Sequence, residues 1–228
     1  MTPPAVGVVL AGGASARMGT AKAAIPWEGG TLLTRAVAAL RPAVGRVVVV
    51  RAPGQDLPAL ADDIAVVQDA RPGRGPLEGM LAGLRALRPD EVAFVCAVDM
   101  PLLEAPFAAA VLAGLRPVAD AAVPRLAGAP HPLAAAYRAD VAGPVAALLA
   151  TDRLRVGGLL DEISVTWLDA PALPGGAGSL MNVNTAADLA AARQLRREKA
   201  TGSPAATPPG GTSASASAPA SDVMAWAP

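Results

Sequence analysis

Short apolar runs alternate along this chain with segments in which apolar residues recur every three or four positions. Residues 6–10, 46–50, 64–67 and 92–98 are apolar runs of strand length, bounded by polar or turn-forming residues. Continuous apolar runs are typical of strands that are buried on both faces of a sheet. Strands that alternate with helices indicate crossover connections and therefore a largely parallel sheet in an α/β fold.

Helical spacing appears between these strands. Three predicted helices carry apolar side chains on one face: Leu32, Leu33, Ala36, Val37 and Leu40 in the first, Leu77, Met80, Leu81, Leu84 and Leu87 in the second, and Phe107, Val111, Leu112 and Leu115 in the third. Pro42 marks the end of the first helix. Pro76 falls in the first turn of the second helix, a position at which proline is favourable.

The second half of the chain continues the same pattern. We expect strands at 121–124 and 133–137 around a loop at 128–132, and a short strand at 165–168. Gly143-Pro144 interrupts a helical run between them, which predicts a kink or a late helix start. Thr185 and Asp188 have the spacing of a capping box, so a last helix should begin there and run to about Lys199.

Composition changes abruptly after this helix. Every residue from 201 to 221 is Thr, Gly, Ser, Pro or Ala. Such a segment buries too little apolar surface to offset an ordering cost of about 1–2 kcal/mol per residue. We therefore expect one folded domain at 1–200 and a disordered tail at 201–228.

Charge and cysteine content exclude several classes of protein. Lys and Arg together number 19, as do Asp and Glu, and this balance argues against a nucleic-acid-binding protein. Cys96 is the only cysteine, which excludes an intramolecular disulfide and a cysteine-rich zinc site. We found neither a signal-peptide pattern nor an apolar run approaching the roughly 20 residues that cross a bilayer, so we expect a cytoplasmic protein without a membrane partner.

The first predicted strand runs into Ala11-Gly12-Gly13. Such small residues let backbone N–H groups approach an anion, and Arg17 and Lys22 add two cations nearby. The pattern predicts a cradle for a triphosphate, although an ordinary strand-to-helix loop with two solvated cations would look the same. Lys22 is not followed by Ser or Thr, so this is no P-loop, and the G-x-G-x-x-G spacing of nicotinamide-dependent oxidoreductases is absent.

Polar residues follow other predicted strands. Asp69, Asp99, Asn182 and Asn184 all come just after an apolar run, and ligands of open α/β sheets bind where the carboxyl ends of the strands meet. Asp99 is the best candidate for a metal ligand, because Mg²⁺ prefers oxygen ligands and takes one or two carboxylates together with substrate phosphates. The alternative is an Asp at a strand end that caps the next turn.

Five motifs then share their order with a known family. The chain resembles the molybdenum cofactor guanylyltransferases, MobA-like members of the sugar-nucleotide-type nucleotidyltransferases, in LAGGASARMGTAK (10–22), GPLEGML (75–81), AVDMP (97–101), HPLAAAY (131–137) and NVNTAADL (182–189). The resemblance covers roughly residues 6 to 195. It implies a three-layer αβα, Rossmann-like nucleotidyltransferase fold with a mainly parallel mixed sheet.

The resemblance also implies a reaction and partners. It implies transfer of GMP from GTP to the terminal phosphate of molybdenum-molybdopterin with release of pyrophosphate, Mg²⁺ as the cofactor, and transient contact with molybdoenzyme apoproteins. Its implied site residues are, for catalysis, Arg17, Lys22 and Asp99; for the nucleotide, Leu10, Ala11, Gly12, Gly13, Lys22, Asp69 and Asp99; for the metal, Asp99; and for the acceptor, His131, Asn182 and Asn184.

Other roles stay open for several of these residues. Asp69 also fits an ordinary loop position, His131 could form a hydrogen bond within its own loop, and Asn184 or Thr185 could cap the last helix.

The chain departs from the family pattern at two places. Ala21 stands where an acidic residue is usual, and Arg51-Ala52-Pro53 lacks the asparagine that some members place against the nucleotide. The LAGG and Asn-Val-Asn motifs favour GTP over CTP. The alternatives are a cytidylyltransferase, a transferase that acts on another phosphorylated acceptor, and a non-catalytic nucleotide-binding module.

Overall fold

The computed structural model of this 228-residue chain describes residues 4–12, 21–71 and 73–201. Gly13 and Arg17, two of the predicted phosphate-binding residues, lie outside the described residues, as does the predicted tail beyond Thr201. The other predicted site residues are described.

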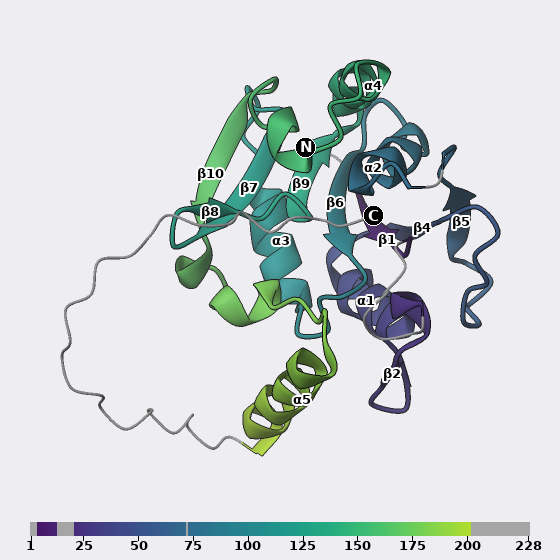
Figure 1. Ribbon diagram of the computed structural model, residues 1–228. Coiled ribbons are helices and arrows are strands. Elements are labelled where there is room, and N and C mark those ends of the chain that lie inside the picture. Colours follow the sequence, from purple (N-terminus) through teal and green to yellow (C-terminus); the bar gives the residue numbers. More distant parts are fainter. Residues whose placement is uncertain (1–3, 13–20, 72, 202–228) are drawn as a thin grey trace, which may run out of the picture.

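One sheet of eight strands forms the centre of the molecule (Figure 1). Its order is β10-β7-β9-β6-β1-β4-β5, with β8 paired to β7. The pairings that involve β9 or β8 are antiparallel and the others are parallel, which confirms the predicted mainly parallel mixed sheet. The strands are β1 (Ala5–Leu10), β4 (Arg46–Arg51), β5 (Ala65–Gln68), β6 (Val92–Ala97), β7 (Ala121–Leu126), β8 (Ala129–Pro130), β9 (Ala134–Arg138) and β10 (Val165–Asp169).

Helices cover both faces of this sheet and confirm the three-layer prediction (Figure 1). The helices are α1 (Leu32–Leu40), α2 (Pro76–Arg85), α3 (Ala105–Ala113), α4 (Ala142–Ala150) and α5 (Ala186–Thr201). Buried side chains of α1, α3 and α5 share one hydrophobic cluster, and those of α2 and α4 share a second on the opposite face. None of the helices in the described residues combines the length and apolar character that a membrane crossing requires.

Close packing of α2 against the sheet depends on a glycine. A Cβ atom on Gly83 would lie 2.4 Å from Cγ1 of Val8 and 3.3 Å from Cγ2 of Val50. Only a residue without a side chain lets the helix approach β1 and β4 this closely. The first turn of α2 is thereby held at the carboxyl edge of the sheet, since the helix follows β5.

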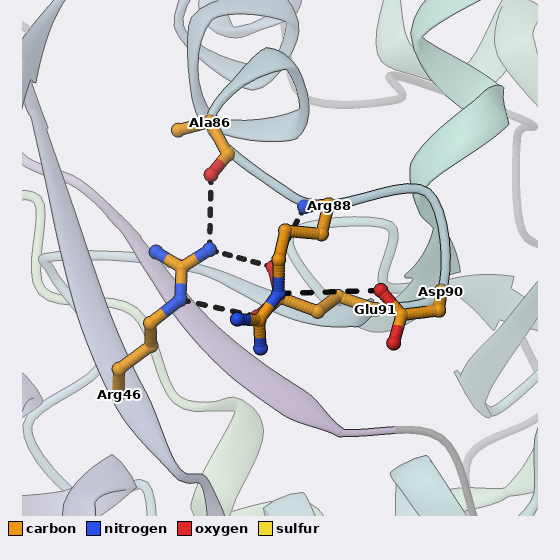
Figure 2. Close-up of polar contacts among 5 residues, drawn as sticks. All are labelled: Arg46, Ala86, Arg88, Asp90 and Glu91. Atoms are coloured by element: carbon orange, nitrogen blue, oxygen red, sulfur yellow. Dashed lines mark hydrogen bonds and ion pairs between the residues drawn. The ribbon is translucent and has the colours of Figure 1, made fainter.

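A buried carboxylate joins three elements at the opposite, amino edge (Figure 2). The side chain of Glu91, just before β6, is 1% exposed and accepts hydrogen bonds from Arg46 Nη2 at 2.6 Å and Nε at 3.2 Å. Arg88 lies 2.9 Å from the same carboxylate, and Arg46 also donates to the carbonyl of Ala86 after α2. The hydrogen bond from Arg46 holds the pKa of Glu91 below its ordinary value, so this ion pair links β4, the end of α2 and β6.

Some elements were not predicted. These are the strands β2 (Pro26–Trp27) and β3 (Gly30–Thr31), which form a hairpin, and the strand β8. Each strand has two residues, which is too short to show an apolar alternation. Of the two outcomes predicted for Gly143-Pro144, the structure shows a helix start. Helix α4 begins at Ala142, so Pro144 lies in its first turn, where a backbone N–H would make no hydrogen bond within the helix.

Candidate active site

Three side chains that are distant in sequence meet at the carboxyl edge of the sheet. Lys22 Nζ lies 2.6 Å from Asp99 Oδ2 and 2.6 Å from Asn184 Oδ1. The side chains of Lys22 and Asp99 are 11% and 9% exposed, so the ammonium and the carboxylate are largely shielded from water. We call Lys22, Asp99 and Asn184 the cation triad.

The chain around Asp99 is held on two sides. Just ahead of it, the N–H of Val98 donates to the carbonyl of Leu10 at 3.1 Å, which continues the pairing of β6 with β1. The carbonyl of Asp99 itself accepts from the N–H of Val183 at 2.9 Å. Met100 is buried beneath this turn. The carboxylate is therefore presented from a backbone that the core and the 182–184 segment both fix.

Asn184 reaches Lys22 because another residue caps α5. The Asp188 carboxylate accepts N–H groups from Asn184 at 2.9 Å and Thr185 at 2.8 Å, and the N–H of Asp188 donates to Thr185 Oγ1 at 3.1 Å. The predicted capping box is thus confirmed. The N–H of Asn184, followed by the Thr185 hydroxyl, lowers the pKa of Asp188. With the helix end satisfied, the Asn184 side chain is available to the cation triad.

Two further oxygens near the cation triad have no hydrogen-bond partner among the described residues. They are Asp99 Oδ1 and Asn182 Oδ1, and both atoms are buried. Buried polar atoms are nearly always paired in native proteins, so these two oxygens are open to a partner such as a bound ion. Both are hard oxygen donors of the kind that Mg²⁺ prefers, and the residues present therefore fit such an ion.

No trio of His, Cys, Asp or Glu side chains capable of holding a metal occurs within residues 4–12, 21–71 and 73–201. A divalent ion at Asp99 would therefore depend on amide oxygens, water and substrate phosphates for its other ligands. That is the usual environment of Mg²⁺ in nucleotide-dependent enzymes.

A second group of site residues surrounds Gly12. A Cβ atom added there would lie 3.6 Å from the backbone N of Ala52 and 3.7 Å from Asp69 Oδ2, which places these segments side by side. Asp69 Oδ1 is buried without a hydrogen-bond partner among the described residues. Burial, followed by the charge of Glu78, raises the pKa of Asp69. A buried acceptor next to a glycine turn is suited to a ligand that donates hydrogen bonds.

Gln55 was not predicted as a site residue. Its Nε2 donates to the carbonyl of Ala11 at 2.9 Å, and its Oε1 accepts from the N–H of Ala52 at 2.9 Å. The side chain thus joins the end of the glycine turn to the loop after β4, the loop that lacks the expected asparagine. An amide three residues after Ala52 was the available signal in the sequence.

Glu78 was also missed. It lies in the first turn of α2 with 3% of its side chain exposed, and its carboxylate oxygens are 3.7 Å from Arg71 Nε and 3.6 Å from Arg74 Nε. Arg74 continues to Asp152 at 2.8 Å, which joins this loop to the segment after α4. In the sequence, Glu78 stands next to Leu77 and three residues before Leu81, so it lies on the apolar face of the predicted helix and could have been recognised as a buried charge.

Leu10 and Ala11 are buried, and Ala11 extends β1 through a 2.8 Å hydrogen bond from its N–H to Val50. Their side chains therefore belong to the core, and they fix the backbone from which the glycine turn begins.

His131 lies at the same edge of the sheet as Asp99. Cys96 in β6 pairs with Ala134 in β9, so the turn before Ala134 lies beside the residues that follow β6. The N–H of His131 donates to the carbonyl of Pro124 at 2.9 Å. Burial lowers the pKa of its imidazole, which is therefore neutral near pH 7. Within the described residues, no hydrogen bond or ion pair joins it to the cation triad.

Comparisons with known proteins identify the family. A family model described as the MobA-like NTP transferase domain matches residues 7–162. A Mycobacterium tuberculosis protein named probable molybdenum cofactor guanylyltransferase is 40% identical over 202 residues, which cover 86% of this chain and 96% of that protein.

Two solved structures share the fold. Molybdopterin-guanine dinucleotide biosynthesis protein A from Archaeoglobus fulgidus superposes with a TM-score of 0.69 at 23% identity, over 85% of this chain and 99% of that one. A Mycobacterium tuberculosis protein in complex with manganese gives a TM-score of 0.56 at 18% identity, over 85% of this chain and 100% of that one.

The family match covers more than half of the chain, and the curated relative is similar over nearly its whole length. The chain belongs to the MobA-like NTP transferase family and is a nucleotidyltransferase.

Proposed function

We propose that this enzyme transfers GMP from GTP to the terminal phosphate of molybdenum-molybdopterin and releases pyrophosphate. The observation that carries the proposal is the cation triad of Lys22, Asp99 and Asn184 at the carboxyl edge of the sheet. The name of the 40% identical Mycobacterium tuberculosis relative supports the choice of substrates.

In the proposed reaction, an oxygen of the acceptor phosphate attacks the α-phosphorus of GTP. The bond from this phosphorus to the oxygen that bridges to the β-phosphate breaks, and pyrophosphate takes the electron pair. Such a displacement needs in-line positioning and stabilisation of negative charge more than covalent help from the protein. Lys22 supplies a shielded ammonium at the edge where the phosphates would lie. The backbone of Gly12 and Gly13, together with Arg17, would hold the remaining phosphate charge.

Asp99 would hold the divalent ion, with Asn182 as a nearby amide oxygen. When bound, Mg²⁺ would neutralise charge on the phosphates. The fold relative solved in complex with manganese supports a divalent ion, and we propose Mg²⁺ as the ion used.

Asp69 is our candidate for contact with the guanosine. Guanine presents two neighbouring donors, N1–H and the N2 amino group, whereas cytosine presents one amino group beside an acceptor nitrogen. A buried carboxylate oxygen next to Gly12, without a partner in the part of the chain that the structure describes, favours the donor-rich base or the ribose hydroxyls. Contact with the base would favour GTP over CTP, whereas contact with the ribose would hold both nucleotides equally.

The acceptor would lie on the other side of the cation triad. Asn182 Oδ1 is a buried acceptor that no described residue satisfies, and the neutral imidazole of His131 lies at the same edge. We propose that these two residues and Asn184 contact the acceptor. We further propose that the enzyme works in the cytoplasm and hands its product to molybdoenzyme apoproteins through transient contact.

Pyrophosphate release tests the proposal directly. The purified chain is offered each of the four nucleoside triphosphates, with and without molybdopterin and Mg²⁺. We expect release only with GTP, acceptor and metal together, and loss of release in Asp99→Asn and Lys22→Met but not in Lys199→Met. Lys199 is the only other lysine and pairs with Glu104 on the surface, so it is a matched control.

Release with CTP in place of GTP would make the enzyme a cytidylyltransferase. Binding of GTP without any release would favour a non-catalytic nucleotide-binding module.

A further inference from the structure

Lys22 contacts one of the two carboxylate oxygens with which Asp99 could bind a divalent cation. Its ammonium is 2.6 Å from Asp99 Oδ2, and the second oxygen of the same carboxylate is buried without a partner among the described residues. A divalent ion on Asp99 would share this carboxylate with the ammonium at a distance of a few ångströms. Like charges this close, and shielded from water, repel strongly.

The segment that contains Lys22 and the helix that follows Asn184 are joined by side-chain contacts. Arg193 of α5 donates to the carbonyl of Pro26 at 2.8 Å, and Arg196 of α5 lies 3.3 Å from Glu28. Pro26 and Glu28 belong to the β2–β3 hairpin that follows the short 3-10 helix of Lys22. Helix α5 therefore holds the Lys22 segment independently of Asp99.

Asn184 is suited to hold Lys22 in the presence of a metal ion. Its Oδ1 is a neutral acceptor 2.6 Å from Nζ, and the Asp188 cap fixes its backbone. A neutral amide keeps its hydrogen bond to an ammonium when Asp99 is occupied, whereas the carboxylate cannot fully satisfy both cations.

We propose that Lys22 and the divalent ion compete for Asp99, and that Asn184 is the positioning residue that keeps Lys22 in the site after the exchange. This inference rests on the proposed metal role of Asp99. In the metal-free enzyme Lys22 neutralises the buried carboxylate. When the ion takes Asp99, Lys22 is released toward the phosphates while Asn184 still holds it.

Binding of Mn²⁺ to the nucleotide-free enzyme, followed by electron paramagnetic resonance, tests the competition. We expect Asp99→Asn to abolish tight binding and Lys22→Met to tighten it about tenfold, the change expected when a competing charged hydrogen bond is removed. Lys199→Met should bind Mn²⁺ as the wild type does.

Unchanged or weaker binding in Lys22→Met, with binding still lost in Asp99→Asn, would overturn the exchange and leave the proposed metal role intact. Unchanged binding in Asp99→Asn would overturn both the metal role of Asp99 and the exchange.

Selective ¹³C labelling of lysine Cε tests the role of Asn184. The sequence contains two lysines, Lys22 and Lys199, so the spectrum holds two signals, and Lys199→Arg assigns them. Added Mg²⁺ should shift the Lys22 signal, leave the Lys199 signal in place, and leave Lys22 motionally restricted.

In Asn184→Ala, Mg²⁺ should instead give Lys22 the narrow line of a freely moving side chain. This variant keeps the Thr185–Asp188 cap and is expected to fold. The proposal would be overturned if Mg²⁺ left the chemical shift of the Lys22 signal unchanged. It would also be overturned if the Lys22 signal of Asn184→Ala kept the line width of a restricted side chain with Mg²⁺ bound.

Discussion

The ammonium of Lys22 and the carboxylate of Asp99 lie 2.6 Å apart although 77 positions separate them in the sequence. Parallel pairing of β1 with β6 brings them together, because the segments that follow two neighbouring parallel strands leave the sheet at the same edge. The pair brings together a shielded positive charge and the carboxylate that we propose as the metal ligand.

Removal of the Lys22 charge should act on turnover. We expect Lys22→Ala to lower kcat by about 10²-fold or more, the scale found when a single electrostatic stabiliser of a transition state is lost. Pyrophosphate release at saturating GTP measures this, with Lys199→Ala as the control and urea unfolding to verify the fold. A variant that turns over at a near-normal rate would remove Lys22 from the catalytic machinery.

Asp69 should control recognition of the nucleotide. Asp69→Asn keeps one acceptor but adds an amino group where the guanine donors would lie, so kcat/KM for GTP should fall by about 10- to 100-fold, or roughly 1–3 kcal/mol. The same variant should discriminate less against the other nucleotides. Equal losses with all four nucleotides would contradict a base-reading role.

The pH dependence of GTP binding should carry the signature of Asp69. Burial raises the pKa of this carboxyl group, so it takes up a proton at a higher pH than an ordinary Asp. Since the carboxylate is the form that accepts two donors, GTP affinity should weaken as the pH falls toward this raised pKa. Calorimetric titration of GTP from pH 8 downward measures the effect, and Asp69→Asn should flatten the profile.

Glu91 should make the fold sensitive to acid. Its pKa is lowered in the folded state, so its contribution to the free energy of unfolding is complete above the ordinary pKa of 4.5 and is lost as the pH falls below it. Glu91→Gln should cost about 1–2 kcal/mol at pH 7, because the charge-assisted hydrogen bonds from the partly exposed Arg46 are weakened.

Urea unfolding at a series of pH values measures this difference, which should shrink below pH 4.5. Asp90→Asn is the control. The Asp90 side chain is 70% exposed and its nearest oxygen is as far as 4.0 Å from Arg88 Nε, so the substitution should change the free energy of unfolding little (Figure 2). A constant difference between wild type and Glu91→Gln across this pH range would contradict the assignment.

Two glycines in helices should respond to alanine in opposite directions. Gly83→Ala forces a Cβ atom against Val8 and should destabilise the fold by about 1–3 kcal/mol through overpacking. Gly157→Ala, in the short 3-10 helix Val156–Leu159, meets no atom of the described residues within 4 Å and should stabilise the fold by about 0.4–1 kcal/mol, because alanine lowers the entropy of the unfolded chain. Urea unfolding of both variants decides, and equal effects would show that α2 does not depend on its close approach to β1.

The regular elements were predictable because their apolar patterns are long. Strand β6, helix α1 and the capping box of α5 lie where the sequence placed them, within one or two residues at the ends. The β2–β3 hairpin was not predictable, since its two-residue strands depend on contact with α1 and α5 rather than on their own pattern.

The site was predictable only in part. The glycine turn after β1 indicated Lys22 and the end of β6 indicated Asp99, but their direct contact required the strand order, which no local pattern contains. Asn184 was expected to contact the acceptor or to cap α5, and its bond to Lys22 depends on Thr185 and Asp188 satisfying the helix end instead. Gln55 and Glu78 act through partners on other elements, so their roles appear only once those elements are folded together.

The most direct test follows the α-phosphate of GTP. With GTP labelled at this phosphorus, molybdenum-molybdopterin and Mg²⁺, we expect the wild-type enzyme to place the label on the acceptor in amounts equal to the pyrophosphate released, and Asp99→Asn to place none. Label that remains in GTP or appears only in free GMP, with no labelled acceptor, would contradict the account.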